Sequence, residues 1–236
     1  MLNFFQKIFD FYIINFHNKR ILKLIDTQNL ETVVDIGCHK AELLQTLIKE
    51  DIVFSKYIGF ELIKKLFDDI ETVFFDNKKT NFFNFALSSK KEKKRISIHK
   101  LTSISSFSTA NSHKIKYKLI NLMLKNSAKN LTNSELVKTD TLDNIKKMFG
   151  THIDLLKIDV EGHESEVLKG GQKFLNESKP KYIIIELQKK GNYLNYDPKN
   201  TIDILESLNY KRIKSINGPL FLFKDVIFQI QRSENK

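Results

Sequence analysis

The sequence predicts an α/β protein built on a mostly parallel sheet with helices on both faces. Short apolar runs rich in β-branched residues alternate along the chain with stretches of helical periodicity. These runs are continuously apolar, which is typical of parallel strands that helices cover on each side. Hydrophobic residues make up 41% of the 236 positions, enough for a sizeable core. We expect one domain over residues 31–236, preceded by a helical extension over residues 1–30.

The first half of the sheet is expected to come from three apolar runs before residue 88. Strands are predicted at residues 32–36, 56–60 and 81–87, and helices at residues 41–50 and 62–72. Strands and helices alternate in this half of the chain. That order along the chain is the one that builds a parallel sheet.

The second half repeats this order and ends in a hairpin. A turn at Asn217-Gly218-Pro219 separates the last two strands. The expected elements are a strand at 153–160, a helix at 165–175, a strand at 182–187, a helix at 201–208, and hairpin strands at 210–216 and 220–224.

Residues 88–150 interrupt the alternation between the third and fourth strands. They contain a Ser- and Thr-rich stretch at 102–112 and a helical-looking stretch at 114–125. Loops of this length without a structural job are uncommon. We therefore expect an insertion that builds a wall or a lid for the substrate.

The positive charge is concentrated in one segment. Residues 78–118 hold eleven basic residues and one acid, Glu92, within a chain whose net charge is +11. Only four of the 39 basic residues are Arg, whereas proteins that read nucleic acids rely on Arg forks. We interpret the segment as a surface feature that faces an acidic substrate or a membrane, and expect no nucleic-acid partner.

The cysteine content and the first residues suggest where the protein works. Cys38 is the only cysteine, so an internal disulfide and a Cys-rich zinc site are excluded and a reducing cytoplasm is expected. Residues 1–25 are rich in aromatic side chains with polar residues at helical spacing, and no apolar run is long enough to span a bilayer. This helix is expected to pack on the core or on a second subunit in a homodimer. The alternative is peripheral contact with the inner face of the membrane.

Two successive strand ends carry residues suited to a nucleotide. The first strand ends in Asp35 and runs through Gly37, Cys38 and His39 into a helix, so backbone N–H groups can approach a ligand. Glu61 ends the second strand, near the spacing at which an acid binds ribose hydroxyls in nucleotide-binding sheets. An ordinary strand-to-helix turn with a surface Glu is the alternative.

The most distinctive stretch is LLKIDVEGHE at residues 155–164. Lys157 and Asp159 are two residues apart on a strand, so they share a face at its carboxyl end, where ligands bind in open α/β sheets. Glu161 and His163 follow in the loop, and Glu186 ends the next strand at the same rim. A structural ion pair and a helix cap are the alternatives for Lys157–Asp159 and His163. We expect no metal; if a divalent cation binds, Asp159 and Glu186 are its expected ligands.

Together these segments resemble the FkbM-type methyltransferases. The resemblance covers residues 31–188 and is carried by VVDIGCHKAE, YIGFE, NFALSS, VKTDTLD and IDLLKIDVEGHESEVLKGG with PKYIIIE. It implies the seven-stranded class I methyltransferase fold, which is Rossmann-like, and S-adenosylmethionine as the cofactor. It also implies O-methylation of a hydroxyl on a sugar, a surface glycan or a small natural product.

The resemblance also implies roles for individual residues. The methionine part of the cofactor is expected at the turn, the ribose at the acid of the second strand, the adenine at the third strand and the methyl group at the fourth. The expected cofactor contacts are Asp35, Gly37, Cys38, His39, Glu61, Ala86, Leu87 and Asp159. The chain departs from the family pattern at His39, where Asn is usual, and at Ala41, where Gly is usual.

The implied reaction is an in-line displacement in which a substrate oxygen attacks the methyl carbon of a sulfonium. A sugar hydroxyl is a poor nucleophile and gains from a base, for which Asp159 and His163 are the candidates, with Glu161 and Glu186 orienting the acceptor. One alternative is a cofactor-binding, non-catalytic subunit of a glycan-assembly complex. An RNA methyltransferase is disfavoured because no Asn/Asp-Pro-Pro-aromatic motif follows the fourth strand. The missing glycines argue against an NAD-dependent oxidoreductase.

Overall fold

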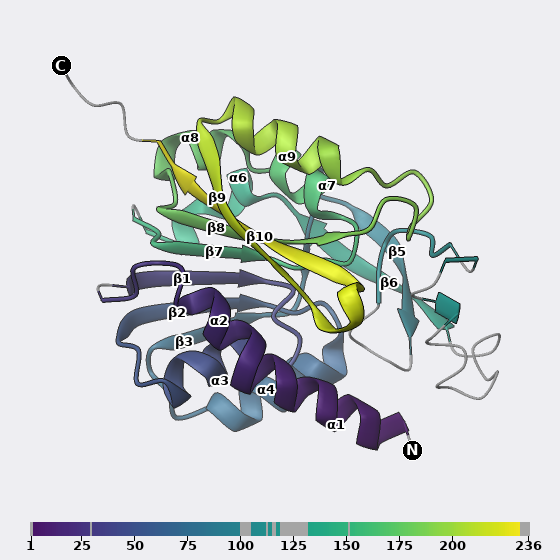
Figure 1. Ribbon diagram of the computed structural model, residues 1–236, viewed down its shortest axis with the longest axis horizontal. Coiled ribbons are helices and arrows are strands. Elements are labelled where there is room, and N and C mark those ends of the chain that lie inside the picture. Colours follow the sequence, from purple (N-terminus) through teal and green to yellow (C-terminus); the bar gives the residue numbers. More distant parts are fainter. Residues whose placement is uncertain are drawn as a thin grey trace.

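The computed structural model describes residues 2–28, 30–99, 105–111, 113–114, 117–118, 132–150 and 152–231. Its main sheet has seven strands in the order β3-β2-β1-β7-β8-β10-β9, and β10 runs antiparallel to both of its neighbours (Figure 1). This arrangement confirms the predicted mostly parallel seven-stranded sheet. The strands are β1 (Leu30–Ile36), β2 (Phe54–Phe60), β3 (Thr80–Phe83), β7 (Leu155–Ile158), β8 (Tyr182–Gln188), β9 (Tyr210–Asn217) and β10 (Phe223–Ile230).

Two apolar clusters, one on each face of the sheet, hold the layers together. Side chains of α2, α3 and α4 pack with the strands in one cluster, and those of α6 to α9 pack in the other. Strand residues are buried in both clusters, as expected for a covered parallel sheet. The helices are α2 (Asn18–Leu22), α3 (Glu42–Lys49), α4 (Lys64–Phe74), α6 (Leu142–Ile145), α7 (Glu164–Lys169), α8 (Gln172–Ser178) and α9 (Pro198–Ser207).

The N-terminal segment forms a helix that crosses the front of the molecule beside β10 (Figure 1). It consists of α1 (Leu2–Tyr12), the π-helical turn η1 (Ile13–His17) and α2. The hydroxyl of Thr46 on α3 donates to the backbone oxygen of Ile14 at 3.1 Å, and the Lys40 ammonium pairs with Asp10 at 2.6 Å. The segment is therefore attached to the domain through α3 and the turn that precedes it.

Two predicted elements are each divided in the structure. The strand expected at 81–87 ends as β3, after which Asn84 turns to donate to the backbone oxygens of Glu61 and Leu62, and β4 (Ala86–Leu87) joins another sheet. The helix expected at 165–175 is broken between α7 and α8 at Gly170. There an added Cβ would lie 2.0 Å from the backbone oxygen of Ser88, so the chain packs too closely for a side chain.

Residues 88–150 are only partly an insertion. β5 (Lys93–His99) and β6 (Thr132–Asp140) form a three-stranded sheet with β4, in the order β4-β6-β5. The residues after β6 return to the main domain, where Leu142, Ile145 and Phe149 are buried in the core and form no part of a lid. Most of the helical-looking stretch predicted at 114–125 lies outside the described residues.

A close approach of two backbones joins the ends of β1 and β7. Gly37 follows β1 with φ +80°, and a Cβ built on it would lie 1.9 Å from the backbone oxygen of Asp159. The N–H groups of Gly37 and Cys38 both donate to the backbone oxygen of Phe60 at 2.9 and 3.0 Å. Glycine at position 37 therefore allows three neighbouring strands to end at one rim.

We predict that Gly37→Ala destabilises the fold far more than Gly150→Ala. Gly150 has φ +84°, but nothing lies within 4 Å of an added Cβ. Ala there should cost only the left-handed backbone penalty of roughly 1–2 kcal/mol, whereas at position 37 the clash adds to it and the total should exceed about 4 kcal/mol. Urea unfolding of both variants measures the difference; equal losses would show that the rim tolerates a side chain.

Candidate functional site

A cavity of about 480 Å³ lies at the carboxyl ends of the parallel strands. Its described lining comes from α1 and η1, from the ends of β1, β2 and β7 and the turns that follow them, from β4, from Glu186 within β8 and from the start of β10. Ile96 of β5 and residues 105–107 extend the wall from the segment predicted as an insertion. Its volume is in the range of small-molecule sites, and the rim of an open α/β sheet is where such ligands bind.

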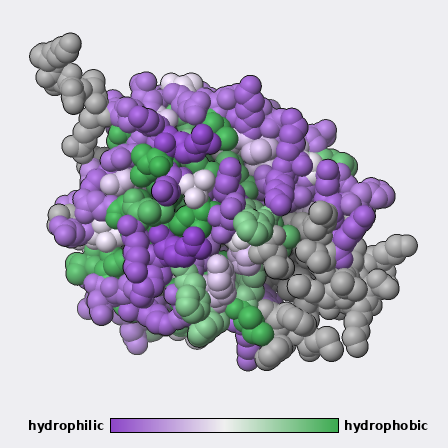
Figure 2. All heavy atoms as spheres, viewed as in Figure 1, coloured by the Kyte–Doolittle hydropathy of each residue, from purple (hydrophilic) through white to green (hydrophobic). Residues whose placement is uncertain are grey.

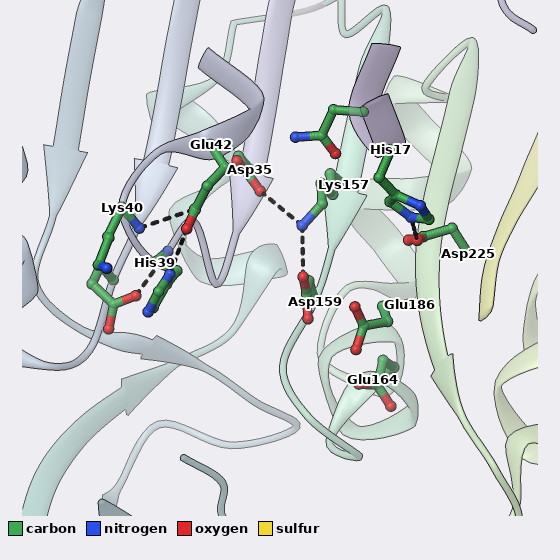
Figure 3. A network of polar contacts seen from close by, with 12 residues as sticks. His17, Asp35, His39, Lys40, Glu42, Lys157, Asp159, Glu164, Glu186 and Asp225 are labelled. Atoms are coloured by element: carbon green, nitrogen blue, oxygen red, sulfur yellow. Dashed lines mark hydrogen bonds and ion pairs between the residues drawn. The ribbon is translucent and has the colours of Figure 1, made fainter. Parts of the chain in front are cut away.

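A buried lysine connects carboxylates at two strand ends. The Lys157 ammonium on β7 lies 2.8 Å from the Asp159 carboxylate and 3.8 Å from that of Asp35 on β1 (Figure 3). Burial alone would lower the pKa of Lys157, but the carboxylates outweigh it and raise that pKa well above its usual value. Lys157 is therefore a fixed cation at the centre of the rim.

Asp35 is the most enclosed of these carboxylates. Its Oδ2 accepts from the Tyr57 hydroxyl at 2.6 Å, while its Oδ1 is buried and makes no hydrogen bond within the described part of the chain. Burial raises the pKa of Asp35, and the nearby Lys157 ammonium offsets only part of that rise. Among the described residues, the nearest cation to Oδ1 is the Lys157 ammonium at 3.8 Å, so Oδ1 can still accept a hydrogen bond from a ligand in the cavity.

Glu61 organises the turns after β1 and β2. One carboxylate oxygen accepts from the His39 N–H at 3.0 Å, and the other accepts from the Ile63 N–H at 2.7 Å. Burial raises the pKa of Glu61 to about 7. Each oxygen retains a second lone pair, so Glu61 can still accept from a ligand hydroxyl.

Both departures from the family pattern lie in a strained turn. His39 has φ +50° and Ala41 has φ +58°, conformations that Asn and Gly adopt most readily. His39 places its Nδ1 2.6 Å from the Glu42 carboxylate, so its ring is held at the edge of the cavity. Burial would lower the pKa of His39, but Glu42 outweighs it and raises that pKa. His39 and Ala41 keep the backbone conformation of the turn. They place an imidazole ring where the family usually has an Asn side chain and a methyl group where it usually has Gly.

A second pair of carboxylates stands on the neighbouring strands. Glu186 on β8 is directly opposite Asp225 on β10, so both side chains project from the same face of the sheet. His17 reaches them from η1, with its Nε2 2.6 Å from the Asp225 carboxylate (Figure 3). His17 and Asp225 are 208 residues apart in sequence, and no local pattern pointed to either.

The cavity is acidic although the chain is basic. Among its described lining residues Lys157 is the only lysine, and there is no arginine. The acidic lining residues are Asp35, Glu42, Glu61, Asp159, Glu161, Glu186 and Asp225. In a chain of net charge +11, this local excess of carboxylates favours a cationic ligand.

The structure separates the predicted site residues into two groups. All of the predicted cofactor residues line the cavity, as do Glu161 and Glu186. His163 does not: its Nε2 lies 2.9 Å from the Ser88 hydroxyl, and its ring packs on Phe107 at 4.9 Å between centroids. Burial, with a smaller effect of Lys94, lowers the pKa of His163 to about 4. The geometry therefore removes His163 from the candidate bases.

Two hydrogen bonds fix the loop after β7. Glu161 accepts a hydrogen bond from the Tyr193 hydroxyl and has φ +51°. Glu164 is fully buried, and its Oε1 accepts from the Gly162 N–H at 2.8 Å. Burial raises the pKa of Glu164 to about 8, so this carboxyl is largely protonated at neutral pH. Glu164 therefore shapes the loop, a role that the sequence did not indicate.

Cys38, Ala86 and Leu87 are buried parts of the cavity wall. Burial raises the pKa of the Cys38 thiol well above its usual value, so it is protonated and serves as an apolar surface. Asp159 and Glu186 are not part of a group of three potential metal ligands in the described residues. The described residues that do form such a group are Asp10, His39 and Glu42, and Asp10 is already paired with Lys40.

The fold and the rim together define the class I methyltransferase architecture. A methyltransferase FkbM from Methylobacillus flagellatus KT matches with a TM-score of 0.56 and 14% identity over 86% of this chain and 44% of that one. Magnesium protoporphyrin IX methyltransferase from Synechocystis PCC 6803, solved with bound S-adenosylmethionine, matches with a TM-score of 0.52 and 9% identity over 92% and 78%. The chain thus spans less than half of the Methylobacillus protein. No curated protein sequence matches it.

The methyltransferase FkbM domain model matches residues 45–212. This match covers more than half of the chain, which therefore belongs to the FkbM methyltransferase family and confirms the resemblance found in its motifs. In the described residues, no helix combines the length and the apolarity needed to cross a membrane.

We predict that Glu164→Gln flattens the decline in stability between about pH 4.5 and 8. The folded-state pKa of Glu164, about 8, lies above its usual 4.5. The contribution of Glu164 to the free energy of unfolding is therefore fully present below pH 4.5 and is lost as pH rises through 8. Wild type should lose roughly 2 kcal/mol or more relative to the variant across this range. Urea unfolding at pH 5, 6.5 and 8 measures the difference. Parallel curves for the two proteins would contradict a raised pKa.

Proposed function

We propose that the chain is an S-adenosylmethionine-dependent O-methyltransferase acting on a hydroxyl of a sugar, a surface glycan or a small natural product. The observation that carries this proposal is the acidic cavity at the strand ends of an otherwise basic FkbM-family chain. S-adenosylmethionine has a sulfonium and an ammonium against one carboxylate, so it is the cation that such a cavity favours. The Synechocystis neighbour holds this molecule in its own structure.

The lining residues fit the parts of this cofactor. Asp35, whose buried Oδ1 accepts no hydrogen bond within the described residues, and the Gly37 turn are proposed to hold the methionine part. Glu61 is proposed to accept from the ribose hydroxyls, and the apolar Ala86 and Leu87 to cover the adenine. Asp35 and Glu61 come from the ends of the neighbouring strands β1 and β2, and Ala86 and Leu87 form β4 of the three-stranded sheet.

Asp159 is the proposed general base. The bound cofactor supplies an activated methyl group, so the protein has to align the acceptor and take its proton. The Asp159 side chain is 26% exposed at the cavity, and Lys157 holds its carboxylate at 2.8 Å. In the transfer, the acceptor oxygen would displace neutral S-adenosylhomocysteine from the methyl carbon as the carbon–sulfur bond breaks, and the hydroxyl proton would pass to the Asp159 carboxylate.

The side of the cavity beyond Asp159 suits a polyhydroxylated ring. Phe9 and Tyr12 of the N-terminal segment and Phe223 of β10 provide apolar surfaces there, next to Glu186 and Asp225. Aromatic rings pack against the C–H faces of a sugar, and carboxylates accept from its hydroxyls. A nucleic-acid acceptor fits poorly, because its phosphates would face this excess of carboxylates.

The release of S-adenosylhomocysteine tests the function directly. The protein is incubated with S-adenosylmethionine and a panel of nucleotide sugars, oligosaccharides and RNA, and the product is quantified by mass spectrometry. Release that depends on a carbohydrate supports the proposal, and release that depends on RNA overturns it. Tight cofactor binding without release on any acceptor would instead favour a non-catalytic subunit.

We predict that S-adenosylmethionine binding releases protons from Glu61. At pH 7 about half of this carboxyl is protonated in the free protein, and hydrogen bonds from ribose hydroxyls would favour its ionised form. Calorimetry in phosphate and in Tris should show a buffer-dependent enthalpy that Glu61→Gln abolishes, with affinity reduced at least about tenfold. Glu71→Gln on the exposed side of α4 is the control and should behave as wild type. A buffer-independent enthalpy in wild type would contradict the assignment.

We predict that Asp159→Asn lowers kcat by roughly 10²- to 10⁴-fold, the usual loss on removing a general base. Cofactor affinity should change little, because the amide keeps the shape of the carboxylate. Glu166→Gln is the control: Glu166 binds Ser89 and Lys169 and is not among the cavity-lining residues. Wild-type turnover in Asp159→Asn would exclude Asp159 as the base.

A further inference from the structure

The outward face of the N-terminal segment exposes large apolar side chains. Its apolar side chains are strongly exposed: Ile8 by 50%, Phe11 by 60% and Phe16 by 53%. Figure 2 shows apolar side chains in green over this helix at the lower part of the view. Large apolar side chains gathered on one face call for a partner, whereas scattered ones do not.

The π-helical turn brings these side chains together. The N–H of Asn18 donates to the backbone oxygen of Ile13, five residues earlier, which widens the helix at η1. Phe11 and Phe16 are also five residues apart, a spacing that puts side chains on different faces of a regular α-helix. Here their rings meet edge to face at 6.2 Å between centroids. The widened turn therefore aligns Phe16 with Ile8 and Phe11 on one exposed surface.

The charges on the same segment have a single sign. Lys7, Arg20 and Lys23 are exposed along it. The only acid in residues 6–25 is Asp10, whose side chain is 15% exposed and is neutralised by Lys40. Apolar and basic side chains interleaved on one helix are the pattern of segments that bind anionic lipid surfaces.

We propose that this outward face, made of Lys7, Ile8, Phe11, Phe16, Arg20 and Lys23, docks on an anionic membrane surface. The aromatic and aliphatic side chains enter the interface between headgroups and acyl chains, and the basic residues pair with lipid phosphates. The inward face of the same segment lines the cavity with Phe9, Tyr12 and His17, and Ile8, which is half exposed and also lines the cavity, lies at the edge between the two faces. Docking therefore places the acceptor side of the cavity next to the bilayer, with the body of the domain in water.

Flotation with lipid vesicles tests this proposal without reference to catalysis. The full chain is mixed with vesicles of phosphatidylcholine alone or of phosphatidylcholine with phosphatidylglycerol. We expect it to float only with the anionic vesicles, and its bound fraction to fall as salt rises. A chain that stays behind with both kinds of vesicle overturns the proposal.

Matched variants assign the binding to this face. Phe11→Ser/Phe16→Ser should lower partitioning onto anionic vesicles at least about tenfold, since it removes two aromatic rings that would be buried in the interface. Phe75→Ser, which removes an aromatic that is 86% exposed after α4, should bind as wild type, and Lys7→Glu/Lys23→Glu should bind less. Equal losses in Phe75→Ser and in the double variant would overturn the assignment.

Self-association is the competing use of the same face. Sedimentation velocity distinguishes the two, because a homodimer built on this face would dissociate in Phe11→Ser/Phe16→Ser. A wild-type dimer that binds no vesicles, with a monomeric double variant, would assign the face to a second copy and refute membrane docking. A wild type that floats on anionic vesicles and sediments as a monomer supports it.

Discussion

The site depends on one buried cation, the ammonium of Lys157, held between the carboxylates of neighbouring strands. A buried charge without a partner is expensive, so this lysine is stable only while Asp159 and Asp35 stand beside it. The ammonium in turn stabilises the ionised carboxylates of Asp35 and Asp159, which lie beside it at the same rim. Because β1 and β7 are hydrogen-bonded neighbours, the pairing also fixes how their ends meet, and Gly37 allows the backbones to approach.

The charge distribution explains how a chain of positive net charge can offer a binding site for a cationic ligand. Most of the positive charge in the sequence belongs to residues 78–118, whereas the cavity is lined with carboxylates. Burial raises the pKa of Asp35 and of Glu61, and the opposing contacts within the protein offset only part of that rise. A bound cation would favour the ionised form of both groups. The negative charge of the cavity is thus balanced only in part by Lys157, the one lysine among its described lining residues.

Sequence reasoning was strongest where a pattern is local. The apolar runs and the alternation of strands and helices indicated the fold, because strands covered on both faces leave a clear signal. The Lys157–Asp159 pair and the positions of Asp35 and Glu61 followed from strand ends in the same way. Backbone packing was harder to foresee: the break at Gly170 depends on the backbone of Ser88, which is distant in sequence. The burial of His163 against Ser88 and Phe107 depends likewise on distant segments.

The contact of His17 with Asp225 joins the first helical segment to the last strand. The described cavity wall accordingly includes residues as far apart in sequence as Gln6 and Asp225. During synthesis the N-terminal segment leaves the ribosome well before β10, its partner strand. The nascent chain must therefore keep this apolar helix without the contact to Asp225 until β10 has emerged, and a product that stopped before β10 would lack Phe223 and Asp225 from the cavity wall.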